Sequence, residues 1–356
     1  MNKAWLAPFA FLYGIAISVR HKLFDWGWLR TQEYDIPVVC VGNITVGGTG
    51  KTPVTEMLVR RLKGDFNIAV LSRGYKRQTK GYVEVEPGMS FLKTGDEAKQ
   101  IKMKFPDVVV AVCEKRADGI AQIRRRHPKV NLIILDDGFQ HRYVEPWVNI
   151  VLMDYTRPVY QDHLLPWGTL RDKVSQMRRA NYVVATKCPP DMSPIDRRIV
   201  NKSLKLYPYQ SLYFSSVAVG QPVPMFPDDA QRSVRRGDSV IAMSGIGNPG
   251  SFEESLAVNY KVAGRLEYPD HHPYRSRDLK DMERALDESP EGTVIIATEK
   301  DAVKLMNSRK IPAGIRQRLY YQPIKVSFYE DTEFDFITKL KNDLRTNPKD
   351  RLLHSQ

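Results

Sequence analysis

Short apolar runs rich in β-branched residues recur through the first half of the chain, and longer mixed segments separate them. The runs cover residues 37–41, 68–71, 108–112, 132–135, 150–153 and 182–185. Most of the intervening segments, for example residues 54–63 and 114–126, are long enough for a helix that crosses back over a sheet. The pattern therefore predicts an α/β fold with a mostly parallel sheet flanked by helices. Ligands of such sheets bind where strands end and helices begin.

The pattern changes between residues 187 and 236, where the chain is richer in proline and polar residues. Only short β-like pieces at residues 211–219 interrupt this stretch, so we interpret it as a connector. Strand-like runs begin again at residues 240–243 and 293–297 and predict a second, smaller α/β unit. The expected domains are an N-terminal helix over residues 1–30, a first domain over 31–235 that includes the connector, and a smaller C-terminal α/β domain over 236–356.

The first thirty residues contain an apolar run that is too short to cross a bilayer. Residues 4–19 are apolar almost throughout and are followed by Arg20, His21 and Lys22, whereas a spanning helix needs about 20 apolar residues. These cations also differ from the small-residue cleavage site of a signal peptide. We expect a helix that docks in the interface of an anionic membrane. The alternative is a helix buried against the protein's own core.

The stretch VGNITVGGTGKTP, residues 41–53, has the strand, glycine loop and helix start of a phosphate-binding loop. Glycines let backbone N–H groups turn toward one anion, the lysine supplies a charge for the β- and γ-phosphates, and the threonine hydroxyl ligates magnesium. The strict pattern has a glycine where this chain has Thr45. We expect a nucleoside triphosphate here. The predicted binding residues are Gly47, Gly48, Thr49, Gly50, Lys51 and Thr52.

A P-loop enzyme also needs a carboxylate at the end of a neighbouring strand to hold magnesium. The run NLIILDD ends in Asp136 and Asp137, which are the predicted metal ligands together with Thr52. The alternative is a pair of acids that caps the turn before Gly138. The residues GFQHR that follow place polar and cationic side chains, among them His141, beside the phosphate site.

Three further stretches gather polar side chains where strands end. SRGYKR places Arg73 after a strand, TGDEAKQ places Asp96 at the start of a helix, and YPDHHPY places His271 in a turn of the second unit. A simple N-cap is the alternative role for Asp96, and a histidine pair alone is more often structural than catalytic. In a protein that binds a triphosphate, a carboxylate and a histidine from opposite domains could activate a substrate hydroxyl.

The cysteine spacing and the net charge indicate which disulfide, metal and partner classes to expect. The three cysteines have no CxxC spacing, so neither a disulfide framework nor a zinc site is indicated. The net charge of +13 suggests an anionic partner, which can be nucleic acid, a membrane surface or a phosphorylated substrate. A merely solvated basic surface is the alternative. The basic residues lie in short clusters rather than in one nucleic-acid-binding motif, and we expect no nucleic-acid partner.

Eight stretches, in order, resemble the tetraacyldisaccharide 4'-kinases of lipid A biosynthesis. They are GNITVGGTGKTP, SRGYKR, GDEA, LDDGFQHR, LLPWGTLRD, SGIGNP, PDHHPY and TEKDAVKL. The resemblance implies a P-loop kinase that uses ATP and Mg²⁺ to phosphorylate the 4'-hydroxyl of a tetraacyldisaccharide 1-phosphate, giving lipid IVA. It also implies a peripheral or monotopic position at the cytoplasmic face of the bacterial inner membrane, and we expect no obligate protein partner.

The resemblance also implies roles for individual residues. Asp96 and His271 match the family's catalytic pair, in which the histidine orients or tunes the aspartate that deprotonates the hydroxyl, and Lys51 holds the phosphates. Contacts to the acceptor lipid or to phosphate are expected from Arg73, Arg116, His141 and Arg171. The chain has GDEA and LLPWGTLRD where the usual forms are GDEP and LLPAGPLRE. Neither change removes a titrating group from the expected site.

Two other P-loop classes are alternatives. A switch ATPase or GTPase shares the sequence GGTGKT, but its guanine-reading form needs an N/T-K-x-D run, and here Pro189 follows Thr186, Lys187 and Cys188. A nucleic-acid-dependent ATPase would explain the positive charge. It does not explain the apolar N-terminus, and the chain has no evident helicase-like series of motifs.

Overall fold

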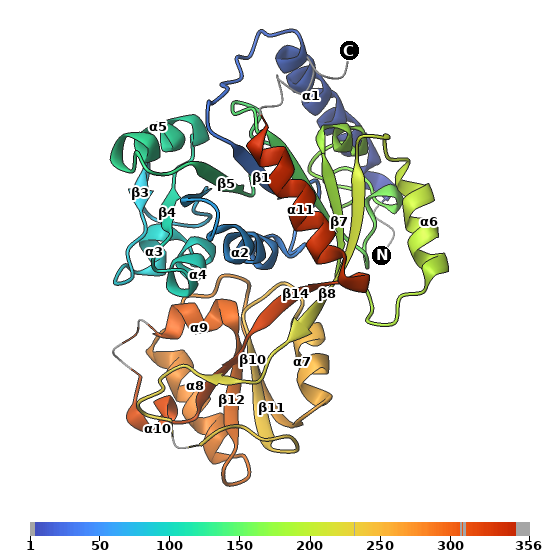
Figure 1. The fold of residues 1–356 in the computed structure, drawn as a ribbon. Coiled ribbons are helices and arrows are strands. Elements are labelled where there is room, and N and C mark those ends of the chain that lie inside the picture. The colour runs from blue at the N-terminus through green and yellow to red at the C-terminus, as the bar shows by residue number, and fades with distance from the viewer. Residues whose placement is uncertain (1–3, 231, 307, 309–310, 347–356) are drawn as a thin grey trace.

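The computed structural model describes residues 4–230, 232–306, 308 and 311–346. Within them the chain forms two β-sheets with helices on their faces, one sheet above the other in the view of Figure 1. The larger sheet has nine strands in the order β14-β8-β7-β6-β1-β5-β2-β4-β3, and the smaller has five in the order β11-β10-β12-β13-β9. The predicted α/β fold with a mostly parallel sheet is confirmed.

The six apolar runs predicted as strands form most of the larger sheet, and all pairs among them are parallel. They are buried on both faces, which explains why they are continuous apolar runs rather than alternating ones. The strands are β1 (Val38–Asn43), β2 (Ile68–Ser72), β4 (Val109–Val112), β5 (Leu132–Asp136), β6 (Val148–Asp154) and β7 (Tyr182–Thr186). At one edge of the sheet, β3 (Val83–Glu84) pairs antiparallel with β4.

Two apolar cores cover the two faces of the larger sheet. On one face lie α2 (Lys51–Leu62), α4 (Asp96–Lys104) and α11 (Thr332–Arg345), with the short α3 (Phe91–Thr94) before α4. On the other face lie α5 (Arg116–Arg126) and α6 (Pro194–Leu204). Because α2 follows β1 directly, its N-terminus lies at the carboxyl edge of the sheet, where β5 also ends.

The stretch interpreted as a connector is more regular than expected. Helix α6 begins with a capping box, in which the side chains of Ser193 and Asp196 each accept from the other's backbone N–H. Strand β8 (Ser211–Val219) lies between β7 and β14 in the larger sheet. The connector interpretation therefore does not hold for residues 194–219. The reason is that β8 has several half-buried or exposed positions, so it lacks the continuous apolar run of the central strands.

The predicted second α/β unit is built around the smaller sheet. Its strands and helices are β9 (Val223–Pro224), β10 (Ser239–Ser244), α7 (Pro249–Ala257), β11 (Lys261–Glu267), α8 (Ser276–Asp287), β12 (Val294–Thr298), α9 (Glu299–Met306), α10 (Ala313–Arg316) and β13 (Leu319–Gln322). The chain then returns to the larger sheet through β14 (Ile324–Phe328), which pairs with β8, and through α11. The larger sheet therefore includes residues that lie beyond the boundary expected at residue 236. The local sequence pattern could not predict this return, because a pairing between distant segments leaves no mark on it.

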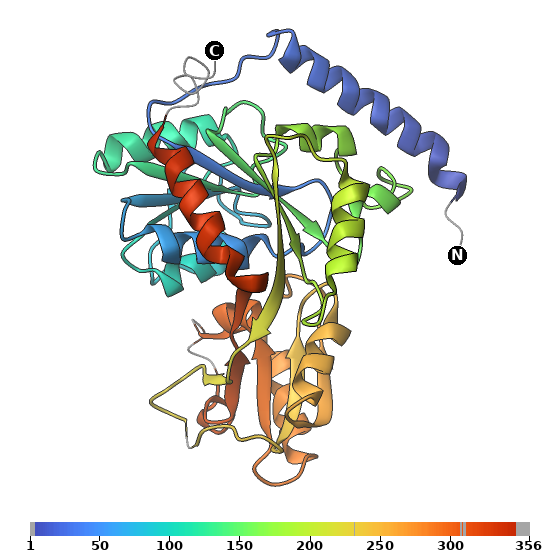
Figure 2. The ribbon, with the colours of Figure 1, turned by 45° about the vertical axis from the view of Figure 1, so that its right-hand side comes forward.

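Helix α1 (Ala7–Asp25) lies along the outside of the larger unit with much of its surface open (Figure 2). Its buried residues are Ala10, Gly14, His21 and Phe24. Exposed large apolar side chains on the helix and beside it are Trp5, Phe9, Phe11, Leu12, Ile15, Val19, Trp26 and Trp28. The alternative of a helix buried in the protein's own core therefore does not hold. Among the described residues, no helix combines the length and apolar character needed to cross a membrane.

Phe336 allows a test of how α11 is held on the sheet. Its ring is fully buried against Tyr182, Tyr213 and Phe328, whereas Phe334 is 80% exposed. We expect Phe336→Ala to lower the free energy of unfolding by about 3–5 kcal/mol, because the change loses buried area and leaves a cavity. Phe334→Ala is the matched control and should change it by less than about 0.5 kcal/mol. Urea denaturation measures both, and equal effects would contradict this packing.

Candidate active site

The loop of residues 44–50 joins β1 to α2. Gly50 has a φ of +82°, which side chains rarely tolerate, and α2 begins at the next residue, Lys51. The buried Thr49 is fixed from two sides, because Asn43 Nδ2 donates to its hydroxyl (2.8 Å) and Thr186 Oγ1 donates to its carbonyl (2.9 Å). The loop is therefore held in place while the N-terminus of α2 is available to an anion, as a phosphate-binding loop requires.

A turn with two carboxylates lies beside Lys51. Asp136 ends β5, and the next residue, Asp137, has a left-handed φ of +54°. One oxygen of Asp137 is 3.8 Å from Lys51 Nζ, and both guanidinium NH₂ groups of Arg171 donate to this carboxylate. Burial opposes the ionisation of Asp137, but Lys51 and Arg171 hold its pKa below the ordinary value. Lys51, Asp137 and Arg171, three residues singled out in the sequence, thus lie together.

Asp136 lies deeper than its neighbour and is almost completely buried. Thr55 Oγ1 donates to its carboxyl group (3.2 Å). Burial raises the pKa of Asp136 to about 7, with contributions from the charges of Glu97 and Asp137. No group of three or more His, Cys, Asp or Glu in the described part of the chain is placed to hold a metal ion by itself. A cation here would need further ligands, such as the half-buried hydroxyl of Thr52 or phosphate oxygens.

Asp96 and His271 meet across the two units. Asp96 begins α4 on the larger unit, and His271 lies in the turn after β11 with a φ of +65°. His271 Nδ1 is 2.7 Å from Asp96 Oδ2. Burial opposes the ionisation of Asp96, but the hydrogen bond from His271 and the charge of Lys300 lower its pKa to about 2. The carboxylate and the histidine predicted from opposite domains are therefore in direct contact, with the carboxylate ionised.

Two further side chains hold this pair, and neither was predicted as a site residue. Lys300 Nζ lies 3.7 Å from Asp96 Oδ2 and 3.4 Å from His271 Nε2. The ring of Tyr75 packs on the imidazole of His271, with 5.1 Å between the ring centroids. Lys300 stands in the stretch TEKDAVKL and Tyr75 in the stretch SRGYKR, but nothing in the sequence distinguishes either residue from its neighbours there.

Arg116 and His141 form a second group beside the carboxylate turn. The buried guanidinium of Arg116 donates to the carbonyl of Cys113 (2.8 Å), and the backbone N–H of Arg116 donates to Nε2 of His141 (3.3 Å). Burial lowers the pKa of His141 to about 4, and the charges of Arg116 and Arg73 add to this shift, so the imidazole is neutral near pH 7. Arg73 itself is exposed.

Glu97 joins the phosphate loop to the pair of Asp96 and His271. It is the second residue of α4 and is half-buried, and burial raises its pKa. The charges of Lys300 and Asp96, from one cluster, and of Lys51 and Asp137, from the other, also act on its pKa. Glu97 is therefore within electrostatic reach of both clusters.

Helix α1 is fixed to the same region. His21 Nε2 is 2.8 Å from Asp172 Oδ1, and both side chains are buried. Arg20 donates to the carbonyl of Gln140 (2.8 Å), and Tyr13 donates to the carbonyl of Arg171 (3.1 Å). The helix therefore contacts both stretches of chain that border the carboxylate turn.

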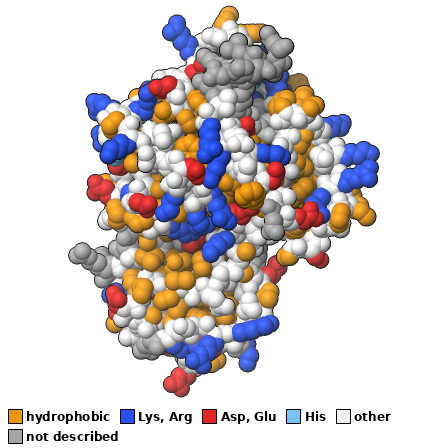
Figure 3. Space-filling model, viewed as in Figure 1, with side chains coloured by type: hydrophobic (Ala, Val, Ile, Leu, Met, Phe, Trp, Pro, Cys, Tyr) orange, Lys and Arg blue, Asp and Glu red, His pale blue; other side chains and the backbone are white. Residues whose placement is uncertain are grey.

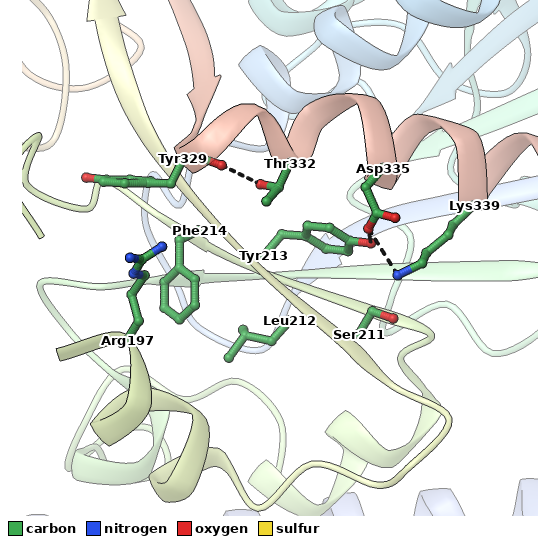
Figure 4. Close-up of a pocket in the computed structure, with 9 residues that line it drawn as sticks. All are labelled: Arg197, Ser211, Leu212, Tyr213, Phe214, Tyr329, Thr332, Asp335 and Lys339. Carbon is green, nitrogen blue, oxygen red and sulfur yellow. Dashed lines mark hydrogen bonds and ion pairs between the residues drawn. The ribbon is translucent and has the colours of Figure 1, made fainter. Parts of the chain in front are cut away.

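The described surface also carries scattered charge and a hollow outside this group of residues. On the face drawn in Figure 3, Lys and Arg side chains are spread over both units with Asp and Glu among them. A hollow of about 350 Å³ lies between α6, β8 and α11 (Figure 4). The residues that line it are Arg197, Ser211, Leu212, Tyr213, Phe214, Tyr329, Thr332, Asp335 and Lys339, and none of them is a predicted site residue.

The chain is similar to several known proteins over most of its length. A family model described as tetraacyldisaccharide-1-P 4'-kinase matches residues 2–344. The tetraacyldisaccharide 4'-kinase of Phocaeicola vulgatus is 41% identical, with 98% of this chain and 97% of that protein covered. The Parabacteroides distasonis protein of the same name is 42% identical over 93% and 92%. A crystal structure of LpxK from Aquifex aeolicus in complex with ATP is similar with a TM-score of 0.73 and 29% identity, covering 95% of this chain and 99% of that one.

The pKa of Asp96 predicts a pH-dependent contribution to stability. Its folded value of about 2 lies below the ordinary 3.8, so the ionised carboxylate stabilises the fold above pH 3.8, and this contribution is lost as the pH falls toward 2. Asp96→Asn removes the titrating group. The difference in unfolding free energy between the natural protein and this variant should be about 1 kcal/mol smaller near pH 3 than near pH 5. Urea denaturation at both pH values measures it, and an unchanged difference would contradict the lowered pKa.

Proposed function

The chain belongs to the tetraacyldisaccharide-1-P 4'-kinase family, and from that premise we propose that Asp96 and His271 carry out the family's reaction here. The reaction is the transfer of the γ-phosphate of ATP to the 4'-hydroxyl of a tetraacyldisaccharide 1-phosphate, which gives lipid IVA in lipid A biosynthesis. The observation that carries the assignment is the 2.7 Å contact between Asp96 and His271 at the edge of the phosphate site.

The donor would lie along the loop that precedes α2. Backbone N–H groups of residues 47–52 would surround the β- and γ-phosphates, and Lys51 would add its charge, as in other phosphate-binding loops. Lys51 Nζ is 3.8 Å from Asp137, at the outer limit of an ion pair. The ammonium group is therefore free to bind a phosphate oxygen without losing a short hydrogen bond.

The carboxylate turn fits Mg²⁺. Burial and the neighbouring Glu97 and Asp137 raise the pKa of Asp136 to about 7, and a cation in reach of this carboxyl would favour its ionised form. Thr52, Asp136 and Asp137 are the residues that would hold the ion, together with phosphate oxygens. When bound, the ion neutralises charge on the β- and γ-phosphates.

At the acceptor, Asp96 takes the proton of the 4'-hydroxyl. The hydroxyl oxygen forms a bond to the γ-phosphorus, the bond from that phosphorus to the bridging oxygen breaks, and ADP leaves with the electron pair. A carboxylate with a pKa of about 2 is a weak base, so proton transfer comes late, which suits the loose transition state of phosphoryl transfer. His271 orients the carboxylate through Nδ1. Contacts to the acceptor or to phosphate are proposed for Arg73, Arg116, His141 and Arg171.

The apolar side chains on α1 give the acceptor a route to the site. The 1-phosphate lipid and the exposed ring of Phe11 would share one bilayer surface, at the cytoplasmic face of the bacterial inner membrane. Arg20 and Lys22 on the same helix suit an anionic surface. Because α1 is fixed to Arg171 and Gln140, docking of the helix would hold the phosphate site close to the headgroups.

A kinase assay with labelled ATP and the tetraacyldisaccharide 1-phosphate in detergent tests both the reaction and the roles of Asp96 and His271. We expect transfer of label to the lipid, and a fall in kcat of about 10²–10⁴ for Asp96→Ala and for His271→Ala, because general base catalysis contributes this much. The KM for ATP should change by no more than about threefold, since neither side chain lies on the phosphate loop. The exposed Asp228→Ala is the control and should keep the natural rate.

The outcomes of this assay separate the alternatives. ATP hydrolysis without transfer to lipid would favour a switch ATPase, and stimulation by DNA would favour a nucleic-acid-dependent ATPase. Near-natural turnover in both Asp96→Ala and His271→Ala, with transfer to lipid retained, would show instead that the pair is misassigned.

Vesicle binding tests the docking surface of α1. Phe11→Ser and Trp28→Ser remove exposed rings, each of which would contribute about 1.5–3 kcal/mol when buried in a bilayer. We expect each change to weaken binding to vesicles of phosphatidylcholine and phosphatidylglycerol about tenfold or more. Phe334→Ser removes an equally exposed ring from α11 and is the control. Added salt should weaken binding by screening the cations, and equal binding of all four proteins would contradict docking through α1.

A further inference from the structure

Three polar side chains lie one turn apart on the same side of α4. Asp96, Gln100 and Lys104 follow the i, i+4, i+8 spacing that places residues in a row along a helix. Asp96 and Gln100 are buried, and the side chain of Lys104 is 23% exposed. An ordinary helix would bury apolar residues here, so the row requires polar partners on the element that covers it.

Those partners come from the first two residues of α9 in the smaller unit. Lys300 lies 3.7 Å from Asp96, and Glu299 is 2.6 Å from Lys104 Nζ and 3.5 Å from Gln100 Nε2. Together these five residues form a polar seam between α4 and α9. The seam places the start of α9 across the polar row of α4, from Asp96 to Lys104.

The seam also reaches the helix that begins at the phosphate loop. Glu56 of α2 accepts from Gln100 Nε2 (2.8 Å) and pairs with Lys104 Nζ (2.6 Å). Lys104 is therefore shared between a carboxylate of the larger unit and one of the smaller unit. Buried ion pairs contribute little net stability, but a wrong register would leave a buried charge without a partner. Such a network specifies one relative position of α2, α4 and α9.

The seam also places Lys300 against both Asp96 and His271. Nε2 of His271 lies 3.4 Å from Lys300 Nζ and 3.6 Å from Oδ2 of the exposed Asp270. A lysine ammonium can only donate, so Lys300 favours a lone pair on Nε2, whereas the Asp270 carboxylate would accept a proton from it. Nδ1 faces Asp96 Oδ2 at 2.7 Å, so the tautomer with its proton on Nδ1 satisfies both Asp96 and Lys300. Lys300 Nζ itself lies 3.3 Å from Asp270, and the charge of Glu97 also acts on it.

We propose that Lys300 is a positioning residue for phosphoryl transfer, held by the polar seam, which fixes the Nδ1–H tautomer of His271 and the orientation of Asp96. The proposal rests on the function proposed above for Asp96 and His271. It makes the start of α9 a part of the active site that depends on the contact between the two units. Lys300 acts through its two neighbours and takes no proton from the substrate.

Lys300→Met and Lys300→Arg test this role, with the exposed Lys280→Met of α8 as the matched control. We expect Lys300→Met to lower kcat about 10–100-fold while the KM for ATP stays within about threefold, because positioning is lost and the phosphate loop is untouched. Lys300→Arg keeps a cation and should restore part of the rate. In the Asp96→Asn background Lys300→Met should cost less than about threefold, since the two residues act as a unit.

The ¹⁵N resonances of the His271 ring provide a readout that does not depend on turnover. The natural protein should show the Nδ1–H tautomer, and Lys300→Met should show a mixture, with the resonances assigned by their loss in His271→Gln. Thermal denaturation establishes that each variant is folded. If Lys300→Met does not fold, Lys300→Arg is measured in its place, because it retains the positive charge. An unchanged tautomer or a kcat within threefold of the natural value in Lys300→Met would overturn the proposal. Absence of lipid phosphorylation by the natural protein would instead overturn the proposed function and leave the tautomer result standing.

Discussion

Helices α4 and α9 belong to different units, and the charged side chains between them need partners because they are buried or mostly buried. Glu299 of α9 pairs with Lys104 across this contact, and Lys300 faces Asp96 there as well as Asp270 of its own unit. The same packing brings His271 to 2.7 Å from Asp96. The contact between Asp96 and His271 therefore depends on the docking of one unit against the other, and a small error in that docking would separate the histidine from the carboxylate.

The phosphate site depends on a balance of charge within the larger unit. Lys51 and Arg171 keep Asp137 ionised, whereas among the described residues Asp136 has a threonine hydroxyl as its side-chain hydrogen-bond donor and two acidic neighbours. The two adjacent carboxyl groups thus have opposite pKa shifts. This contrast arises because Asp137 turns outward with a left-handed φ while Asp136 stays within β5. A triphosphate with its cation would complete the pairing of these charges.

Helix α1 joins an exposed apolar surface to this site. Its Arg20 and Tyr13 side chains donate to the carbonyls of Gln140 and Arg171, and large apolar side chains along the helix are exposed. The buried pair of His21 and Asp172 fixes the C-terminal half of the helix, where a shift would leave a carboxylate without its partner. A substrate that stays in a membrane would thereby meet a site held at a defined height above it.

The sequence by itself determined the central strands, the phosphate loop and the family. Continuous apolar runs such as residues 132–135 are buried on both faces, and the motifs are short stretches in which local geometry carries the chemistry. It also identified Asp96 and His271, although the contact between them could only be expected. The tertiary structure alone decided that β8 and β14 pair at one edge of the larger sheet and that α11 packs on its face, because contacts between distant segments leave no local pattern. For the same reason only the fold could reveal Lys300, since its role comes from what α9 packs against and not from its neighbours in sequence.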